Sequence, residues 1–334
     1  MQFRRRWSPI ALFAIVAAFQ ASSAFAAMDL KAEAAKLQKA KGQEAVDIAN
    51  GVIDEQKKIP GPLDKDRFGA AVVAEFEPLI AGHNPDAALN AAIAIAKQHT
   101  ASTDSALEKM LSNANPAIRY WGAKGVGEIP NLKAVGGEGA ALRALNAQLP
   151  KETSGLVKKE IIRAIAKLDS ITEMVKALDT LAAAMQTTTP DQETLEAASI
   201  GLTELDIAIK EAVSKGKPPA PAEILDIAKK VTLLLSFASQ QEVALFNART
   251  KDGGALPDGY HANVVAVTNN GIKVLNSLAG MSAFTGVPGD LDPNATLLLL
   301  NGVTGAAFGE TPGSGQVQKT FPGVTTPPAI KPGK

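Results

Sequence analysis

Apolar residues recur at intervals of three and four along most of the chain, and this periodicity limits what the chain can fold into. It is clearest over residues 171–186, where one face collects Ile171, Met174, Val175, Leu178, Leu181, Ala182 and Met185. Such spacing places side chains on one face of an α-helix, whereas a half-buried strand needs strict alternation. Alanine, the best helix former, is very common, and aromatic residues make up only 4%. The sequence therefore predicts an all-α fold.

Proline- and glycine-rich breaks divide the chain into four expected parts. Residues 1–26 are set apart by composition, residues 29–169 read as a helical repeat region, and residues 170–303 read as a helical bundle. Residues 304–334 contain 6 glycines and 5 prolines in 31 positions, with no apolar period. Such a composition cannot bury enough apolar surface to fold, so we expect a disordered tail there.

The first 26 residues have the features of a secretory signal peptide. Arg4, Arg5 and Arg6 form a basic start, an uncharged apolar run covers 10–19, and Ala24-Phe25-Ala26 fits a small-x-small cleavage site. The run is shorter than the ~20 residues that span a bilayer. We expect cleavage after Ala26 and an extracytoplasmic location in the periplasm. An uncleaved anchor is the alternative.

Charge and cysteine content exclude several partner classes. The signal segment holds three of the 34 basic residues and none of the 34 acidic ones, so the remainder carries 31 against 34. A slightly acidic chain does not suit nucleic acid or an anionic membrane. The absence of cysteine rules out disulfides, thiolate metal sites and a lipoprotein anchor. No further apolar run is long enough for stable membrane insertion.

A helix–turn–helix pattern over residues 104–129 is the one family-like feature. Leu107, Met110 and Leu111 precede Asn115-Pro116, which is followed by Ile118-Arg119 and then by Ala123, Val126 and Ile129. Asparagine can cap the second helix and proline suits its first turn. The pattern resembles a HEAT repeat, in which two antiparallel helices join through an Asp-Pro-like turn. A weaker copy begins at Asn84-Pro85, 31 residues earlier, and another covers 157–168.

The resemblance implies a short α-solenoid that binds proteins as a scaffold. Tyr120-Trp121-Gly122, Gly125 and Gly127 depart from the family pattern; the glycines either permit close packing or mark a degenerate repeat. An ordinary antiparallel bundle is the alternative fold.

Arg119, Tyr120 and Trp121 are the candidate partner-binding residues. Aromatic and arginine side chains are enriched at binding hot spots. Adjacent helical residues point about 100° apart, so we expect Trp121 to be buried between paired helices and Tyr120 to be partly exposed. Arg119 near the turn can instead bridge to a neighbouring repeat.

The sequence predicts no catalytic residues, no metal site and no cofactor. Three histidines are present, and of these His261 has one nearby carboxylate, Asp258, which is too few ligands for a metal. The run from Asp290 to Asn294 superficially opens a calcium loop, but Asp292-Pro293 reads better as a helix start. The expected function is therefore protein interaction or scaffolding. The alternative is a small-ligand carrier with an apolar cavity in the C-terminal bundle.

Overall fold

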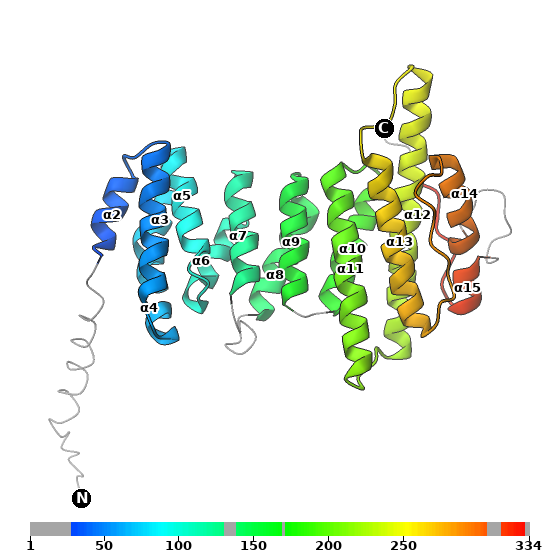
Figure 1. Ribbon diagram of the computed structural model, residues 1–334, viewed down its shortest axis with the longest axis horizontal. Coiled ribbons are helices and arrows are strands. Elements are labelled where there is room, and N and C mark those ends of the chain that lie inside the picture. The colour runs from blue at the N-terminus through cyan, green and yellow to red at the C-terminus, as the bar shows by residue number, and fades with distance from the viewer. Residues whose placement is uncertain (1–27, 130–137, 169–170, 306–314, 331–334) are drawn as a thin grey trace, which may run out of the picture. The chain divides into compact units, whose positions relative to one another are not determined.

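The all-α fold predicted from the sequence is confirmed by a computed structural model of the chain (Figure 1). The structure describes residues 28–129, 138–168, 171–305 and 315–330, and within these ranges it contains helices and no strand. The predicted signal peptide lies outside the described residues. None of the described helices combines the length and apolarity needed to cross a membrane.

The chain separates into two compact units, with the boundary between Thr103 and Asp104. This boundary differs from the one expected at residues 169 and 170. The physical reason is that the helix Gly155–Lys167 packs along the helix Gln192–Ser214, so packing continues across the expected boundary.

The N-terminal unit, residues 28–103, is built from four α-helices and a short 3-10 turn. They are α2 (Leu30–Leu37), α3 (Gln43–Lys58), α4 (Pro62–Ile80), α5 (Pro85–Ala96) and η2 (Ala101–Thr103). Helix α5 contacts both α3 and α4, and its alanine-rich sequence is buried on nearly every side. Phe76 and Ile95 are fully buried in this core.

The C-terminal unit, residues 104–330, contains the remaining helices. They are α6 (Asp104–Met110), α7 (Pro116–Glu128), α8 (Glu138–Gln148), η3 (Leu149–Lys151), α9 (Gly155–Lys167), α10 (Ile171–Met185), α11 (Gln192–Ser214), α12 (Pro221–Lys251), α13 (Tyr260–Ala279), α14 (Pro293–Thr304) and α15 (Gln316–Thr320).

These helices pack in two layers. In one layer α7 contacts α9, α9 contacts α11, and α11 contacts α13; in the other, α6, α8, α10, α12 and α14 follow one another in the same way. Consecutive helices also contact across the layers, as in the pairs α6–α7, α8–α9, α10–α11 and α12–α13. Most of these helices therefore pack against at least one sequence neighbour across the layers and against the helices two places away in their own layer (Figure 1).

Glycines lie where helices of the C-terminal unit approach most closely. A Cβ atom added to Gly122 of α7 would lie 2.9 Å from Cβ of Met110 on α6. One added to Gly271 of α13 would lie 2.4 Å from a methyl carbon of Leu235 on α12. Of the two sequence-based explanations for the glycines of α7, close packing is the one that applies to Gly122.

Several helix starts follow the rule expected from the sequence, an amide or carboxylate cap followed by proline. The side chain of Asn84 accepts from the N–H groups of Asp86 and Ala87, and Asn115 accepts from Ala117. Asp292 accepts from Ala295 at 2.9 Å, so the interpretation of Asp292-Pro293 as a helix start is confirmed.

Residues 315–330 do not match the disordered tail expected for 304–334. Val317 is fully buried, and Phe321 and Val324 are nearly so. Helix α15 packs on α14, and Gln318 donates to the carbonyl oxygen of Thr304 at 2.7 Å. The large apolar residues Val317, Phe321 and Val324 are enough to hold this segment because their side chains are buried. The rest of the expected tail beyond Gly305 lies outside the described residues.

Candidate functional site

The local sequence fixes the start of α7 and with it the position of Arg119. Asn113 accepts from the N–H of Asn115 at 2.8 Å, and Asn115 accepts in turn from Ala117 at 2.9 Å. These bonds form the turn, and Pro116 occupies the first helical position, where no N–H partner is needed. Arg119 consequently lies in the first turn of α7.

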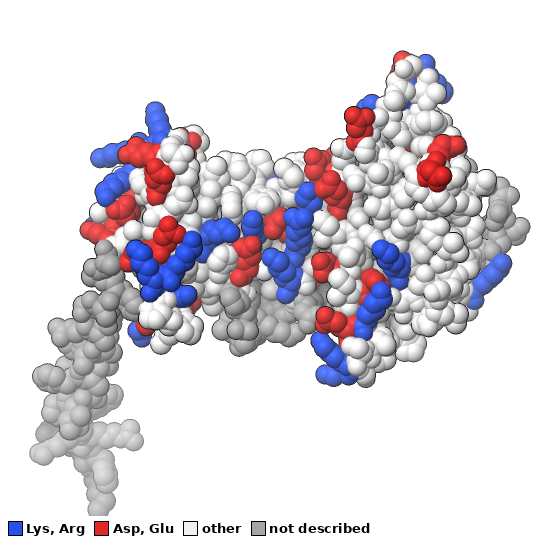
Figure 2. All heavy atoms as spheres, in the orientation of Figure 1, with Lys and Arg blue, Asp and Glu red and all other residues white. Residues whose placement is uncertain are grey.

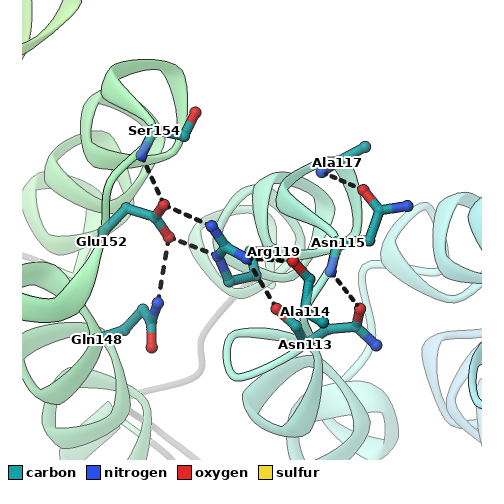
Figure 3. Close-up of polar contacts among 8 residues, drawn as sticks. All are labelled: Asn113, Ala114, Asn115, Ala117, Arg119, Gln148, Glu152 and Ser154. Carbon is teal, nitrogen blue, oxygen red and sulfur yellow. Dashed lines mark hydrogen bonds and ion pairs between the residues drawn. The ribbon is translucent and has the colours of Figure 1, made fainter.

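Arg119 makes a bidentate ion pair with Glu152, which precedes α9 (Figure 3). Its Nε donates to Oε2 at 2.6 Å and its Nη2 donates to Oε1 at 2.7 Å. The remaining terminal nitrogen donates to the carbonyl oxygens of Asn113 and Ala114, both at 2.9 Å. The Glu152 side chain is fully buried and that of Arg119 is 12% exposed. The pair therefore links the start of α7 to the segment before α9.

Glu152 is also held by its own neighbourhood. The N–H of Ser154 donates to Oε1 at 2.8 Å, and Gln148 donates to Oε2 at 3.2 Å. Burial alone would raise the pKa of Glu152, but the hydrogen bonds from Arg119, Ser154 and Gln148 outweigh it and hold the pKa below its usual value. The carboxylate is thus charged and fully partnered at neutral pH.

This geometry gives Arg119 the bridging role that the sequence allowed. Four hydrogen bonds occupy its guanidinium within the protein. Contact between Arg119 and a partner protein stays a prediction, as it does for Tyr120 and Trp121.

Tyr120, Trp121 and Lys124 form a small aromatic cluster on α7. The two rings meet edge to face, with centroids 5.7 Å apart and planes at 89°. Nζ of Lys124 lies 5.8 Å from the Tyr120 centroid and 5.0 Å from the Trp121 centroid, within cation–π range. All three side chains are partly exposed, so the cluster is available at the surface.

The expected burial of Trp121 between paired helices is wrong. Trp121 is only half-buried, and Gly122 takes the position against α6. A rotation of about 100° per residue cannot bring both neighbours to the same contact. The close approach of Met110 to Gly122 leaves the indole on the outer side.

His261 pairs with Glu242, whereas the sequence had suggested Asp258 as its neighbour. Nδ1 of His261 lies 2.7 Å from Oε1 of Glu242, whose side chain is fully buried between α12 and α13. Burial raises the pKa of Glu242 to about 7, and the hydrogen bond from His261 opposes this rise. Asp258 instead uses its backbone oxygen, which accepts from Gln192. The described residues contain no group of three or more histidines and carboxylates that could hold a metal.

A groove of about 410 Å³ lies between α10 and the beginning of α12, next to the loop that joins α11 to α12. Its apolar lining comes from Ile171, Val175, Pro218, Pro219, Ala222 and Ile227. Its charged lining comes from Lys176, Lys217, Lys230, Glu223 and Asp226. The volume is that of a small-molecule site, but the groove is open and rimmed by charge rather than enclosed and apolar.

Charged groups of both signs are mixed over the face of the molecule shown in Figure 2. Many form close pairs within one helix, such as Lys36 with Glu33 and Lys210 with Asp206, each at 2.7 Å. On this face neither sign gathers into a large patch.

Comparison with known proteins does not assign the chain to a family. No protein family matches it, and no curated protein matches it. Among solved structures it is similar to an engineered protein, at 16% identity and a TM-score of 0.35, over 94% of this chain and 80% of that chain. A similarity at this level carries no argument about function.

Proposed function

We propose that the chain is an exported protein-interaction module, in which stacked helix pairs of the HEAT type present a binding surface. The two-layer packing of the C-terminal unit supports this, because each helix packs mainly against near neighbours in the chain. The Asn-Pro helix starts of α5 and α7 support a repeated unit.

The observation that carries the proposal is the Tyr120–Trp121–Lys124 cluster on a helix whose position is fixed. Aromatic side chains at a surface lose little conformational entropy on binding and bury a large area. The Arg119–Glu152 pair holds the first turn of α7, so the cluster is presented in a preorganised geometry. A partner with an apolar or acidic segment suits two rings beside an ammonium group.

The test is capture of partners from a cell-envelope extract by the purified chain. We expect Tyr120→Ala together with Trp121→Ala to reduce the captured protein by about tenfold, as loss of a hot spot does. Leu298→Ala is the matched control, because Leu298 is 68% exposed on α14, away from the cluster. Undiminished capture by the double variant would refute the role of the cluster.

Carriage of a small ligand is the second candidate function, and the groove between α10 and α12 favours it. Lys230 is already paired with Asp226 at 3.0 Å and Lys176 with Glu173 at 2.6 Å. With those two lysines paired, Lys217 and Glu223 leave the rim without an excess of either charge. An amphipathic ligand that carries a single charged group fits an apolar floor with such a mixed rim.

Titration with 8-anilino-1-naphthalenesulfonate, an apolar anion, tests this candidate. We expect Ile171→Trp, which fills the groove, to weaken binding by about tenfold. The control Ile207→Trp changes an exposed residue of α11 that does not line the groove. Equal binding by both variants and the unmodified chain would exclude the groove as the site.

A further inference from the structure

Residues 321–330, here called the C-terminal strap, form an uncharged segment that follows α15 (Figure 1). It opens with a turn, in which the N–H of Val324 donates to the carbonyl oxygen of Phe321 at 3.1 Å, and residues 324–330 continue without helix or turn. Beyond the turn, Val324 and Pro327 are buried and Ile330 is partly buried, whereas Thr325 and Pro328 are exposed. Burial therefore recurs at every third residue over residues 324–330. A period of three is that of the polyproline II helix, and the prolines of the segment favour this conformation.

The path of the strap along α12 has the length that a polyproline II segment requires. Gly323 lies against the side chain of Leu225 near the start of α12, and Ile330 reaches Gln240. The fifteen helical residues from Leu225 to Gln240 rise about 22 Å. The seven residues from Gly323 to Ile330 span about 22 Å at ~3.1 Å per residue. The strap thus lies along α12 nearly fully extended.

Gln240 binds the backbone of the strap rather than its side chains. Its side-chain oxygen accepts from the N–H of Ile330 at 2.9 Å, and its amide nitrogen donates to the carbonyl oxygen of Pro328 at 3.3 Å. Gln240 is 4% exposed and its amide is also held by Ser236 at 2.8 Å, so it is oriented in advance. At the other end, the ring of Phe321 stacks on Phe284 with centroids 6.2 Å apart.

We propose that this surface of α12, from Leu225 to Gln240, is a recognition site for uncharged polyproline II segments with an apolar residue at every third position. In this structure the strap occupies that site. A site that combines backbone hydrogen bonds with pockets at fixed spacing accepts any segment of matching pattern. A proline-rich segment of a partner must displace the strap to bind. This surface is separate from the aromatic cluster on α7 and does not depend on it.

A synthetic peptide with the sequence of residues 315–330 tests the proposal on the full chain. Val324→Asp in the chain places a charge at a buried strap position, which frees the site; Thr325→Asp places the same charge at an exposed one. We expect the fluorescent peptide to bind the Val324→Asp chain at least about tenfold more tightly than the Thr325→Asp chain. Adding Gln240→Leu to the Val324→Asp chain removes this binding.

A second measurement uses the unaltered chain, so that it holds even if a variant fails to fold. A tethered segment acts at an effective concentration in the millimolar range, so about 1 mM peptide or more is needed to compete. With a ¹⁵N-labelled chain, we expect the peptide to accelerate hydrogen exchange at the chain's own residues 321–330, and a peptide carrying Val324→Asp to leave it unchanged. If the unmodified peptide leaves exchange unchanged, or the folded Val324→Asp chain does not bind it, the proposal is overturned.

Discussion

Gly127 of α7 lies so close to Ala164 of α9 that a Cβ atom on the glycine would be 2.8 Å from the Ala164 Cα. The contacted atom belongs to the backbone of α9, so a side chain at this position cannot be accommodated by a rotamer change. The two helices of this layer are therefore held at a spacing that only glycine permits. A substitution of Gly127 therefore tests how closely α7 packs on α9.

Gly127→Ala is expected to destabilise the C-terminal unit by about 1–2 kcal/mol, because overpacking outweighs the better helix propensity of alanine. Gly302 of α14 is the matched control, since a Cβ there would meet nothing within 4 Å. Gly302→Ala should be neutral or stabilise by up to about 1 kcal/mol. Urea unfolding followed by circular dichroism compares the two. A stabilised Gly127→Ala variant would contradict the close packing of α7 on α9.

Glu152→Gln is expected to cost about 2–4 kcal/mol, because it leaves the guanidinium of Arg119 without its buried counter-charge. The control is Glu211→Gln, which breaks the exposed pair with Lys215 and should cost at most about 0.5 kcal/mol. The difference between the two costs is measured as the shift of the urea midpoint. Equal shifts would show that the Arg119–Glu152 pair does not hold α7 to α9.

The lowered pKa of Glu152 gives its contribution a definite pH dependence. A carboxyl group whose pKa is lower in the folded state stabilises the protein above its unfolded pKa, and this stability is lost as the pH falls through the folded pKa. We therefore expect the gap between the unmodified chain and Glu152→Gln to shrink below about pH 4.5. Unfolding free energies measured across the acid range check this. A gap that stays constant with pH would assign the cost to lost packing.

The stability that Glu242 contributes should depend on pH in the opposite direction to that of Glu152. Burial raises its pKa to about 7, so its stabilising contribution is complete below the unfolded pKa of about 4.5 and is lost as the pH rises through 7. Glu242→Gln keeps a neutral group at every pH. We expect it to be more stable than the unmodified chain by about 3 kcal/mol at pH 8 and by less than about 1 kcal/mol at pH 5. Glu204→Gln, at an exposed position on α11, is the control and should change little at either pH.

Removal of the signal peptide is a further prediction. Expression with export in a bacterial host should yield a chain that begins at Ala27, as read by intact mass and N-terminal sequencing. The control replaces Ala24 and Ala26 by bulky residues, which should block cleavage because the cleavage site requires small side chains. A purified extracytoplasmic chain that still begins at Met1 would contradict this assignment.

Features set by neighbouring residues were predictable from the sequence. The amphipathic helices and the caps at Asn115 and Asp292 depend on interactions within a few residues. Pairings between residues far apart in the sequence were not predictable in this way. His261 and Glu242 are 19 residues apart, and Ile330 and Gln240 are 90 apart, so only the packing of α12 with its neighbours brings them together.

At the candidate site, the sequence pointed to Arg119, Tyr120 and Trp121, but the burial predicted for Trp121 was wrong. Arg119 bridges to the segment before α9, as the repeat pattern allowed, but nothing in the pattern singled out Glu152 as its partner. Trp121 was expected between the paired helices because only one of two adjacent aromatic residues can point into the core. Whether Trp121 is buried depends on the distance between α6 and α7, which Gly122 sets. A single sequence does not reveal that distance.

The alternating helix layers of the C-terminal unit determine which insertions or deletions of helices would preserve its packing. Since α9 packs with α7 and α11, and α10 with α8 and α12, duplication of one hairpin would re-create interfaces that already exist. Growth or shortening by whole hairpins would thus conserve the packing on either side, whereas insertion of a single helix would exchange the layers of every element that follows it.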